Sequence, residues 1–115
     1  MNKKLDFYCD EVLSGRFPIK KVVETENCLA FNHTKPGWSV HIVIIPKTHI
    51  ESLTDLQNLD LVKELFQIVT DIVKTKELFK TNYKIITNGG SFQESKHLHF
   101  HLVSGEPLGK ANIMV

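Results

Sequence analysis

The chain has 115 residues, of which 42% are hydrophobic and 23% charged. This composition suits one compact domain with a modest core, and it is unlike that of disordered or fibrous chains. Fourteen basic residues nearly balance thirteen acidic ones, so no broad electrostatic field favours nucleic acid or an anionic membrane as a partner. The longest apolar run, residues 42–45, falls far short of the roughly 20 residues of a membrane span. We predict a single domain over residues 1–115, with its core at about 6–105.

The start of the chain and its cysteines bear on location. The first residues, MNKKLDFYCDEV, turn acidic where a secretion signal would be apolar. The two cysteines, Cys9 and Cys28, are too few for a disulfide framework and fit a reducing compartment. We therefore expect a cytoplasmic protein.

The first third of the chain predicts a short helix and then strands. Residues 6–13 carry apolar side chains near helical spacing, and Gly15 stands where a C-terminal cap belongs. The strongest strand is rich in β-branched residues and is stopped by Pro46, which cannot donate to a ladder. Strands are expected at residues 20–24, 28–32 and 39–45.

The rest of the chain predicts one long helix between strands. Over residues 54–78 apolar side chains recur every three or four residues, and Thr54 or Asp55 is a plausible N-cap. Two further strands are expected at residues 83–87 and 97–103. Connections of mostly hairpin length argue for an antiparallel sheet covered on one side by helix, an α+β domain.

Three of the six histidines, His97, His99 and His101, fall within five residues. In an extended segment they share one face, because successive side chains point to opposite faces. The other face is predicted to be buried beneath the long helix, and it carries Leu98, Phe100 and Leu102.

Three interpretations fit such a row. It is the wet face of a strand, although three consecutive outward histidines are uncommon. It is a metal site, since imidazole suits zinc. Or it performs nucleophilic or acid–base chemistry at phosphorus, since imidazole is a good neutral nucleophile near pH 7. The preceding loop, residues 88–95 (NGGSFQES), favours the third, because its glycines and neutral donors suit a phosphate.

These motifs resemble the histidine triad (HIT) superfamily. HLHFHLV, from His97, matches its signature of alternating histidines, and HIVIIPKTHIESL, from His41, is similar to a strand and loop that the family carries about 50 residues earlier. The resemblance implies a five-stranded antiparallel sheet with one long and one short helix, and usually a homodimer. It also implies a purine nucleoside phosphoramidate or related nucleotide as substrate, attacked at the α-phosphorus without any required metal or organic cofactor.

The resemblance assigns roles to individual residues. His99 occupies the position of the nucleophile, which forms a transient nucleotidyl-histidine. His101 matches the histidine that hydrogen-bonds phosphate or leaving group, and His97 matches the one that supports the nucleophile. The expected substrate-binding residues are Asn88, Gln93, His41, His33 and Phe31, of which Asn88 and Gln93 match phosphate-contacting positions.

The chain departs from the family pattern at two positions near these residues. His33 stands where the family commonly has an aspartate that reaches the ribose hydroxyls, and an imidazole accepts hydrogen bonds less well than a carboxylate. Phe92 stands where a glycine often precedes Gln93. One alternative to an enzyme is therefore a catalytically weak nucleotide-binding or regulatory module.

A further departure concerns zinc. Many bacterial members bind structural zinc through a CxxC pair, the histidine of PKxH and the first triad histidine, and the matching residues here are Asp6, Cys9, His49 and His97. Because a carboxylate can ligate zinc, one interpretation is a weakened structural zinc site, or a zinc-binding protein. The other is a partly buried Cys9 and a loop His49 with no metal.

Overall fold

The computed structural model describes residues 6–109, which contain a five-stranded antiparallel sheet. The strands are β1 (Lys21–Glu24), β2 (Cys28–Asn32), β3 (Trp38–Pro46), β4 (Lys84–Ile86) and β5 (Phe100–Pro107). They lie in the order β1-β2-β3-β5-β4, and the longest strand, β3, pairs with β2 and β5 in the middle of the sheet. The predicted α+β fold is confirmed. Residues 1–5 and 110–115 of the predicted single domain lie outside the described part.

The long helix, α1, runs from Leu59 to Thr75. Its N-cap is Asn58, whose side-chain oxygen accepts hydrogen bonds from the backbone amides two and three residues later, at 3.0 and 3.2 Å. The predicted start at Thr54 or Asp55 is wrong, because residues 53–55 form a separate 3-10 turn. The predicted end at residue 78 is also late. Glu77 adopts a left-handed conformation with φ 55°, which ends the helical path.

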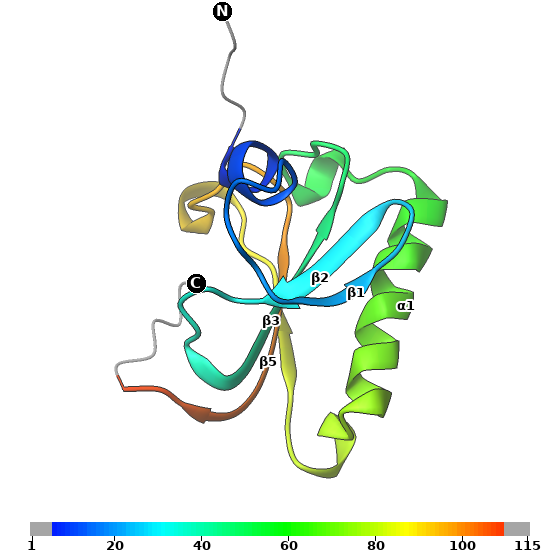
Figure 1. Ribbon diagram of the computed structural model, residues 1–115. Coiled ribbons are helices and arrows are strands. Elements are labelled where there is room, and N and C mark those ends of the chain that lie inside the picture. Colours follow the sequence, from blue (N-terminus) through cyan, green and yellow to red (C-terminus); the bar gives the residue numbers. More distant parts are fainter. Residues whose placement is uncertain (1–5, 110–115) are drawn as a thin grey trace, which may run out of the picture.

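The alternation of side chains along the strands gives the sheet two different faces. One face packs against α1, which Figure 1 shows running beside the sheet. Its buried residues from the sheet and the segment before β5 are Cys28, Ala30, Ile42, Ile44, Leu98, Phe100 and Leu102. The predicted burial of Leu98, Phe100 and Leu102 is therefore confirmed.

The short N-terminal helix covers one end of the opposite face. It is a π-helical turn, Tyr8–Val12, and Gly15 follows it with φ 83°. Tyr8 and Val12 pack on Leu29, Phe31, Val43 and Ile45. The sheet is thus covered on both faces rather than on one alone, and the second layer leaves room for a cavity beside the helix.

The last strand begins later than predicted. Residues 97–99 precede the ladder, and β5 starts only at Phe100. The backbone N–H of Leu98 bonds to the carbonyl of Ile50 at 2.6 Å, in a loop rather than in a neighbouring strand. β1 begins one residue later than the predicted strand 20–24 and ends with it, and β4 is one residue shorter at each end than the predicted strand 83–87. No helix within residues 6–109 is long and apolar enough to cross a membrane.

Candidate active site

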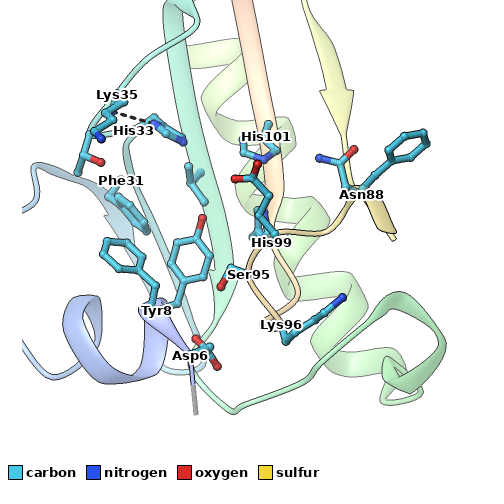
Figure 2. A pocket seen from close by; sticks show the side chains of 15 residues that line it. Asp6, Tyr8, Phe31, His33, Lys35, Asn88, Ser95, Lys96, His99 and His101 are labelled. Carbon is cyan, nitrogen blue, oxygen red and sulfur yellow. Dashed lines mark hydrogen bonds between the residues drawn. The ribbon is translucent and has the colours of Figure 1, made fainter. Parts of the chain in front are cut away.

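A cavity of about 580 Å³ lies on the face of the sheet that carries the N-terminal helix. In Figure 2, Tyr8 and Phe31 stand on one side and Asn88 on the other, with His99 and His101 between them. The remaining lining residues come from the helix, the loop after β2, β3 and the loop before β5: Asp6, Phe7, His33, Thr34, Lys35, Val43, Phe92, Glu94, Ser95 and Lys96.

The hydrogen bonds of His99 fix its tautomer. Its Nδ1 lies 2.7 Å from the backbone carbonyl of His97. A carbonyl can only accept, so Nδ1 carries the proton and Nε2 of the neutral ring keeps a lone pair. Burial lowers the pKa of His99, which favours that neutral form. His99 therefore has the state required of a nucleophile.

A chain of hydrogen bonds fixes the tautomer of His101. The backbone N–H of Gly37 donates to Nδ1 of His41 at 2.9 Å, so neutral His41 carries its proton on Nε2. That atom donates to Nδ1 of His101 at 2.9 Å, so the proton of neutral His101 lies on Nε2. Burial lowers the pKa of His41 to about 4 and that of His101 to about 3, so both rings are neutral.

The far nitrogen of His101 is a donor without a partner. Its Nε2 is buried and makes no hydrogen bond to any residue of the described chain. A buried donor of this kind costs free energy unless a ligand or water satisfies it. Because His101 lines the cavity 5.0 Å from His99 between ring centroids, the site offers a lone pair and a proton side by side.

The other predicted substrate-binding residues divide between the cavity and its surroundings. Phe31, His33 and Asn88 line the cavity, and His41 lies behind His101. Gln93 does not reach it. Its side-chain amide donates to the carbonyl of Glu51 at 2.6 Å and is buried there.

Ser95 and Tyr8 also line the cavity, and neither is among the site residues predicted from the sequence. Ser95 has a buried hydroxyl with no hydrogen-bond partner among residues 6–109, and it belongs to the loop whose neutral donors indicate phosphate. Tyr8 has its ring 5.0 Å from that of His99. No local pattern could link Tyr8 to His99, because only the tertiary fold brings the two segments together.

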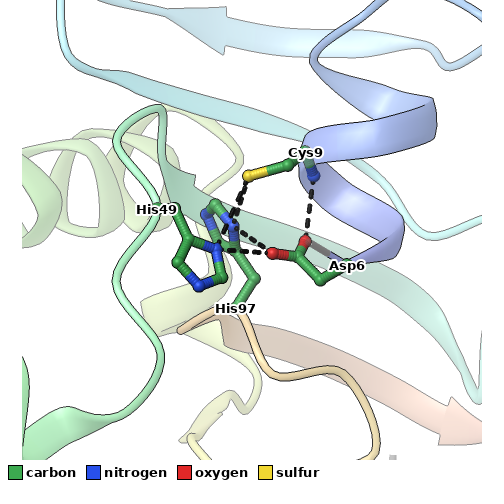
Figure 3. Close-up of side chains that lie close together, drawn as sticks. All are labelled: Asp6, Cys9, His49 and His97. Atoms are coloured by element: carbon green, nitrogen blue, oxygen red, sulfur yellow. Dashed lines mark hydrogen bonds and ion pairs between the residues drawn. The ribbon is translucent and has the colours of Figure 1, made fainter. Parts of the chain in front are cut away.

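His97 belongs to a second cluster, which we call the four-donor cluster: Asp6, Cys9, His49 and His97. Figure 3 shows these side chains converging from the N-terminal helix, the loop after β3 and the segment before β5. Cys9 Sγ lies 3.3 Å from His97 Nδ1 and 3.6 Å from His49 Nδ1. Asp6 Oδ2 lies 3.3 Å from His97 Nδ1 and 2.6 Å from His49 Nδ1.

The spacing of these donors fits a tetrahedral zinc ion. Bond lengths of about 2.3 Å to sulfur and about 2.0–2.1 Å to nitrogen or oxygen put neighbouring ligand atoms about 3.3–3.6 Å apart. Three of the four distances above match, and the Asp6–His49 pair is shorter. His97 also donates from Nε2 to the carbonyl of Pro46 at 2.8 Å, which leaves Nδ1 free to ligate. Burial, with a smaller contribution from the negative charge of Asp6, raises the pKa of Cys9 to about 11. Metal binding would therefore displace the thiol proton.

Comparison with known proteins gives consistent matches. The model of the HIT domain family matches residues 14–108. A histidine triad protein from Clostridium difficile is 34% identical, with a TM-score of 0.80 over 97% of this chain and 100% of its own. A HIT family hydrolase from Legionella pneumophila is 29% identical, with a TM-score of 0.78 over 90% and 95%. A histidine triad nucleotide-binding protein from Candida albicans is 27% identical, with a TM-score of 0.79 over 90% and 80%.

Proposed function

The chain belongs to the HIT domain family, and on that premise we propose that it is a nucleotide-binding hydrolase or transferase. Its substrate would be a purine nucleoside phosphoramidate or related nucleotide, attacked at the α-phosphorus. One observation carries the proposal: the free lone pair on His99 Nε2 beside the unpartnered N–H of His101 in one cavity. The names of the Legionella hydrolase and the Candida nucleotide-binding protein support it.

The chemistry proceeds in two steps. In the first, His99 Nε2 forms a bond to phosphorus while the phosphorus–nitrogen bond of the phosphoramidate, protonated on its nitrogen from solvent, breaks and the amine leaves; neutral His101 keeps its proton and donates a hydrogen bond from Nε2 to a phosphoryl oxygen. The His97 carbonyl stabilises the cationic His99 ring through Nδ1–H. In the second step, water attacks phosphorus, the bond to His99 breaks, and the proton of the attacking water passes to solvent. The proposed steps use two neutral imidazoles, water and protons from solvent, and require no metal or organic cofactor.

The neighbouring residues provide binding and orientation. Ser95 and Asn88 reach the cavity from the loop that precedes the triad, and we assign them to the phosphate oxygens. His41 holds the tautomer of His101 rather than touching substrate. Gln93 donates to the carbonyl of Glu51 and so positions that loop. We therefore assign it to the support of the loop rather than to phosphate binding.

Trapping of the intermediate tests the proposal. The protein is mixed with adenosine 5′-phosphoramidate, quenched at alkaline pH to preserve phosphorus–nitrogen bonds, and analysed by mass spectrometry. We expect an adenylyl group on the peptide that contains His99, and none in His99→Ala. Nucleotide binding without adduct or turnover would instead identify a nucleotide-binding module, and the enzyme proposal would be wrong.

We also propose that the four-donor cluster holds a structural zinc ion. The observation that favours it is the convergence of one sulfur, two nitrogens and one oxygen, all within 4.8 Å of one another. Such an ion would tie the N-terminal helix to the loop after β3 and to His97, whose carbonyl orients the nucleophile.

We further propose a homodimer formed through the β4 edge of the sheet. An open edge strand can pair with a second copy of the chain, and β4 is the edge strand on one side of the sheet. Beside it, apolar side chains that are 40–59% exposed surround a hollow of about 510 Å³: Phe66, Phe79, Tyr83 and Ile85. The opposite edge, β1, instead carries the charged pair Lys21 and Glu24.

Replacement of Ile85 by lysine is expected to convert the dimer to a monomer, because it places a charge in the apolar patch on the edge strand. Sedimentation velocity at micromolar concentration should move from twice 13.2 kDa to 13.2 kDa. Leu59→Lys is the matched control, since Leu59 is 80% exposed at the start of α1, outside the patch. A wild-type mass of one chain would refute the dimer.

A further inference from the structure

One end of the cavity is made by three consecutive residues that follow β2. His33, Thr34 and Lys35 line the same cavity as the reacting histidines. The His33 ring stacks on His41 with centroids 4.3 Å apart and lies 5.8 Å from His101. A group bound at this end would therefore be a close neighbour of the phosphorus that His99 attacks.

The hydrogen bonds at this end make His33 a donor. The backbone N–H of Lys35 donates to His33 Nδ1 at 2.9 Å, so the neutral ring carries its proton on Nε2. Figure 2 shows the ring between Lys35 and the open middle of the cavity, with the dashed bond on the side of Lys35. Nε2–H is thus the group that the ring offers to a ligand.

Among residues 6–109, no carboxylate forms an ion pair with His33 or Lys35. Among the described lining residues the acids are Asp6 and Glu94. Asp6 is engaged in the four-donor cluster, and Glu94 takes part in no ion pair within residues 6–109. Lys35 takes part in none of the ion pairs found within residues 6–109. An ammonium, an imidazole N–H and the Thr34 hydroxyl therefore line the same cavity, and neither Lys35 nor His33 forms an ion pair within residues 6–109.

We propose that His33, Thr34 and Lys35 bind a second phosphate of the substrate, so that the preferred nucleotide carries an anionic group besides the one attacked by His99. Imidazole N–H and ammonium donors form strong, charge-assisted hydrogen bonds with phosphate oxygens. A pair of sugar hydroxyls would gain more from an acceptor such as a carboxylate. The second phosphate belongs either to the sugar or to the leaving-group side, and both offer the same chemistry. The inference rests on the proposed function.

Titration calorimetry with three ligands tests it in the His99→Ala background, in which the nucleophile is absent. The ligands are adenosine 5′-monophosphate, adenosine 5′-diphosphate and adenosine 3′,5′-bisphosphate. We expect at least one of the two doubly phosphorylated ligands to bind at least tenfold more tightly than the monophosphate. Gain with the diphosphate places the second phosphate on the leaving-group side, and gain with the bisphosphate places it on the sugar.

Additional variants locate the effect. His33→Asp should abolish the tenfold preference, and Lys35→Ala, at an exposed position that does not endanger folding, should reduce it. Lys63→Ala removes a lysine from α1 on the other side of the sheet and should leave it unchanged. Equal affinity for all three ligands, or a preference that survives in His33→Asp, overturns the inference while monophosphate binding still supports the proposed function. Failure to bind any nucleotide overturns both.

Discussion

Replacement of His99 by alanine is expected to lower kcat for adenosine 5′-phosphoramidate by on the order of 10³-fold or more, as removal of a nucleophile does in other enzymes. The variant loses the lone pair that Nδ1 bonding to the His97 carbonyl keeps on Nε2. The phosphate contacts assigned to Asn88, Ser95 and His101 remain in place. Nucleotide affinity should therefore change by only a fewfold. Steady-state kinetics and calorimetry on the same preparation measure the two quantities.

Two further variants accompany this experiment: His101→Ala as a comparison and Lys63→Ala as a control. Loss of the unpartnered His101 donor should weaken both binding and turnover, because we assign that donor to phosphoryl oxygens in the bound substrate and in the transition state. Lys63→Ala, on α1, should match the wild type in both assays. Hydrolysis by His99→Ala at near the wild-type rate would show that water attacks phosphorus directly, and the two-step mechanism would be wrong.

Loss of a zinc ligand is expected to have the largest effect on stability. Cys9→Ala and His49→Ala should each lower zinc content from about one ion per chain, and should cost about 2–4 kcal/mol in the free energy of unfolding. For a domain of this size that corresponds to a fall in Tm of roughly 10–20 °C. Elemental analysis and calorimetric unfolding provide the measurements. Chelation of the wild-type protein should produce a similar shift.

Two further variants distinguish a bound zinc ion from hydrogen bonding among the four side chains alone. His33→Ala removes a histidine outside the four-donor cluster and should leave zinc content and chelator sensitivity unchanged. Asp6→Cys should retain zinc, because thiolate is a better ligand than carboxylate for this ion. The zinc proposal would be wrong if the purified protein contained no zinc and its Tm changed with neither chelator nor added zinc. The four side chains would then form a metal-free polar cluster.

The bounds of a strand can be predicted where its pattern of apolar residues ends at a residue that stops a strand. The predicted bounds of β3 lie within one residue of the observed ones at each end, because its β-branched run stops at Pro46. The start of β5 is not predictable in this way, since the alternation of His97, Leu98 and His99 persists where no partner strand exists. The same holds for the start of α1. Several residues before it resemble N-caps, and only the structure shows that the Asn58 side chain makes the capping bonds.

The site can be predicted in composition but not in arrangement. The spacing of the histidines indicates one catalytic row, whereas the structure turns the His97 side chain into the four-donor cluster and leaves its carbonyl to His99. The direction of Gln93 depends on Glu51, 42 residues away. Such contacts depend on how the loops pack and leave no local pattern in the sequence.

The loop that joins β2 to β3 donates two of its backbone amides to imidazoles rather than to other backbone groups. Lys35 N–H bonds to His33 and Gly37 N–H bonds to His41, each at 2.9 Å. Amide protons in a surface loop normally exchange quickly with solvent, but these two are held by side chains of the reacting centre. The hydrogen-exchange rate of the Gly37 amide therefore reports, without substrate or assay, how much of the time the proton pattern at His41 and His101 is intact, and that of the Lys35 amide reports the same for His33.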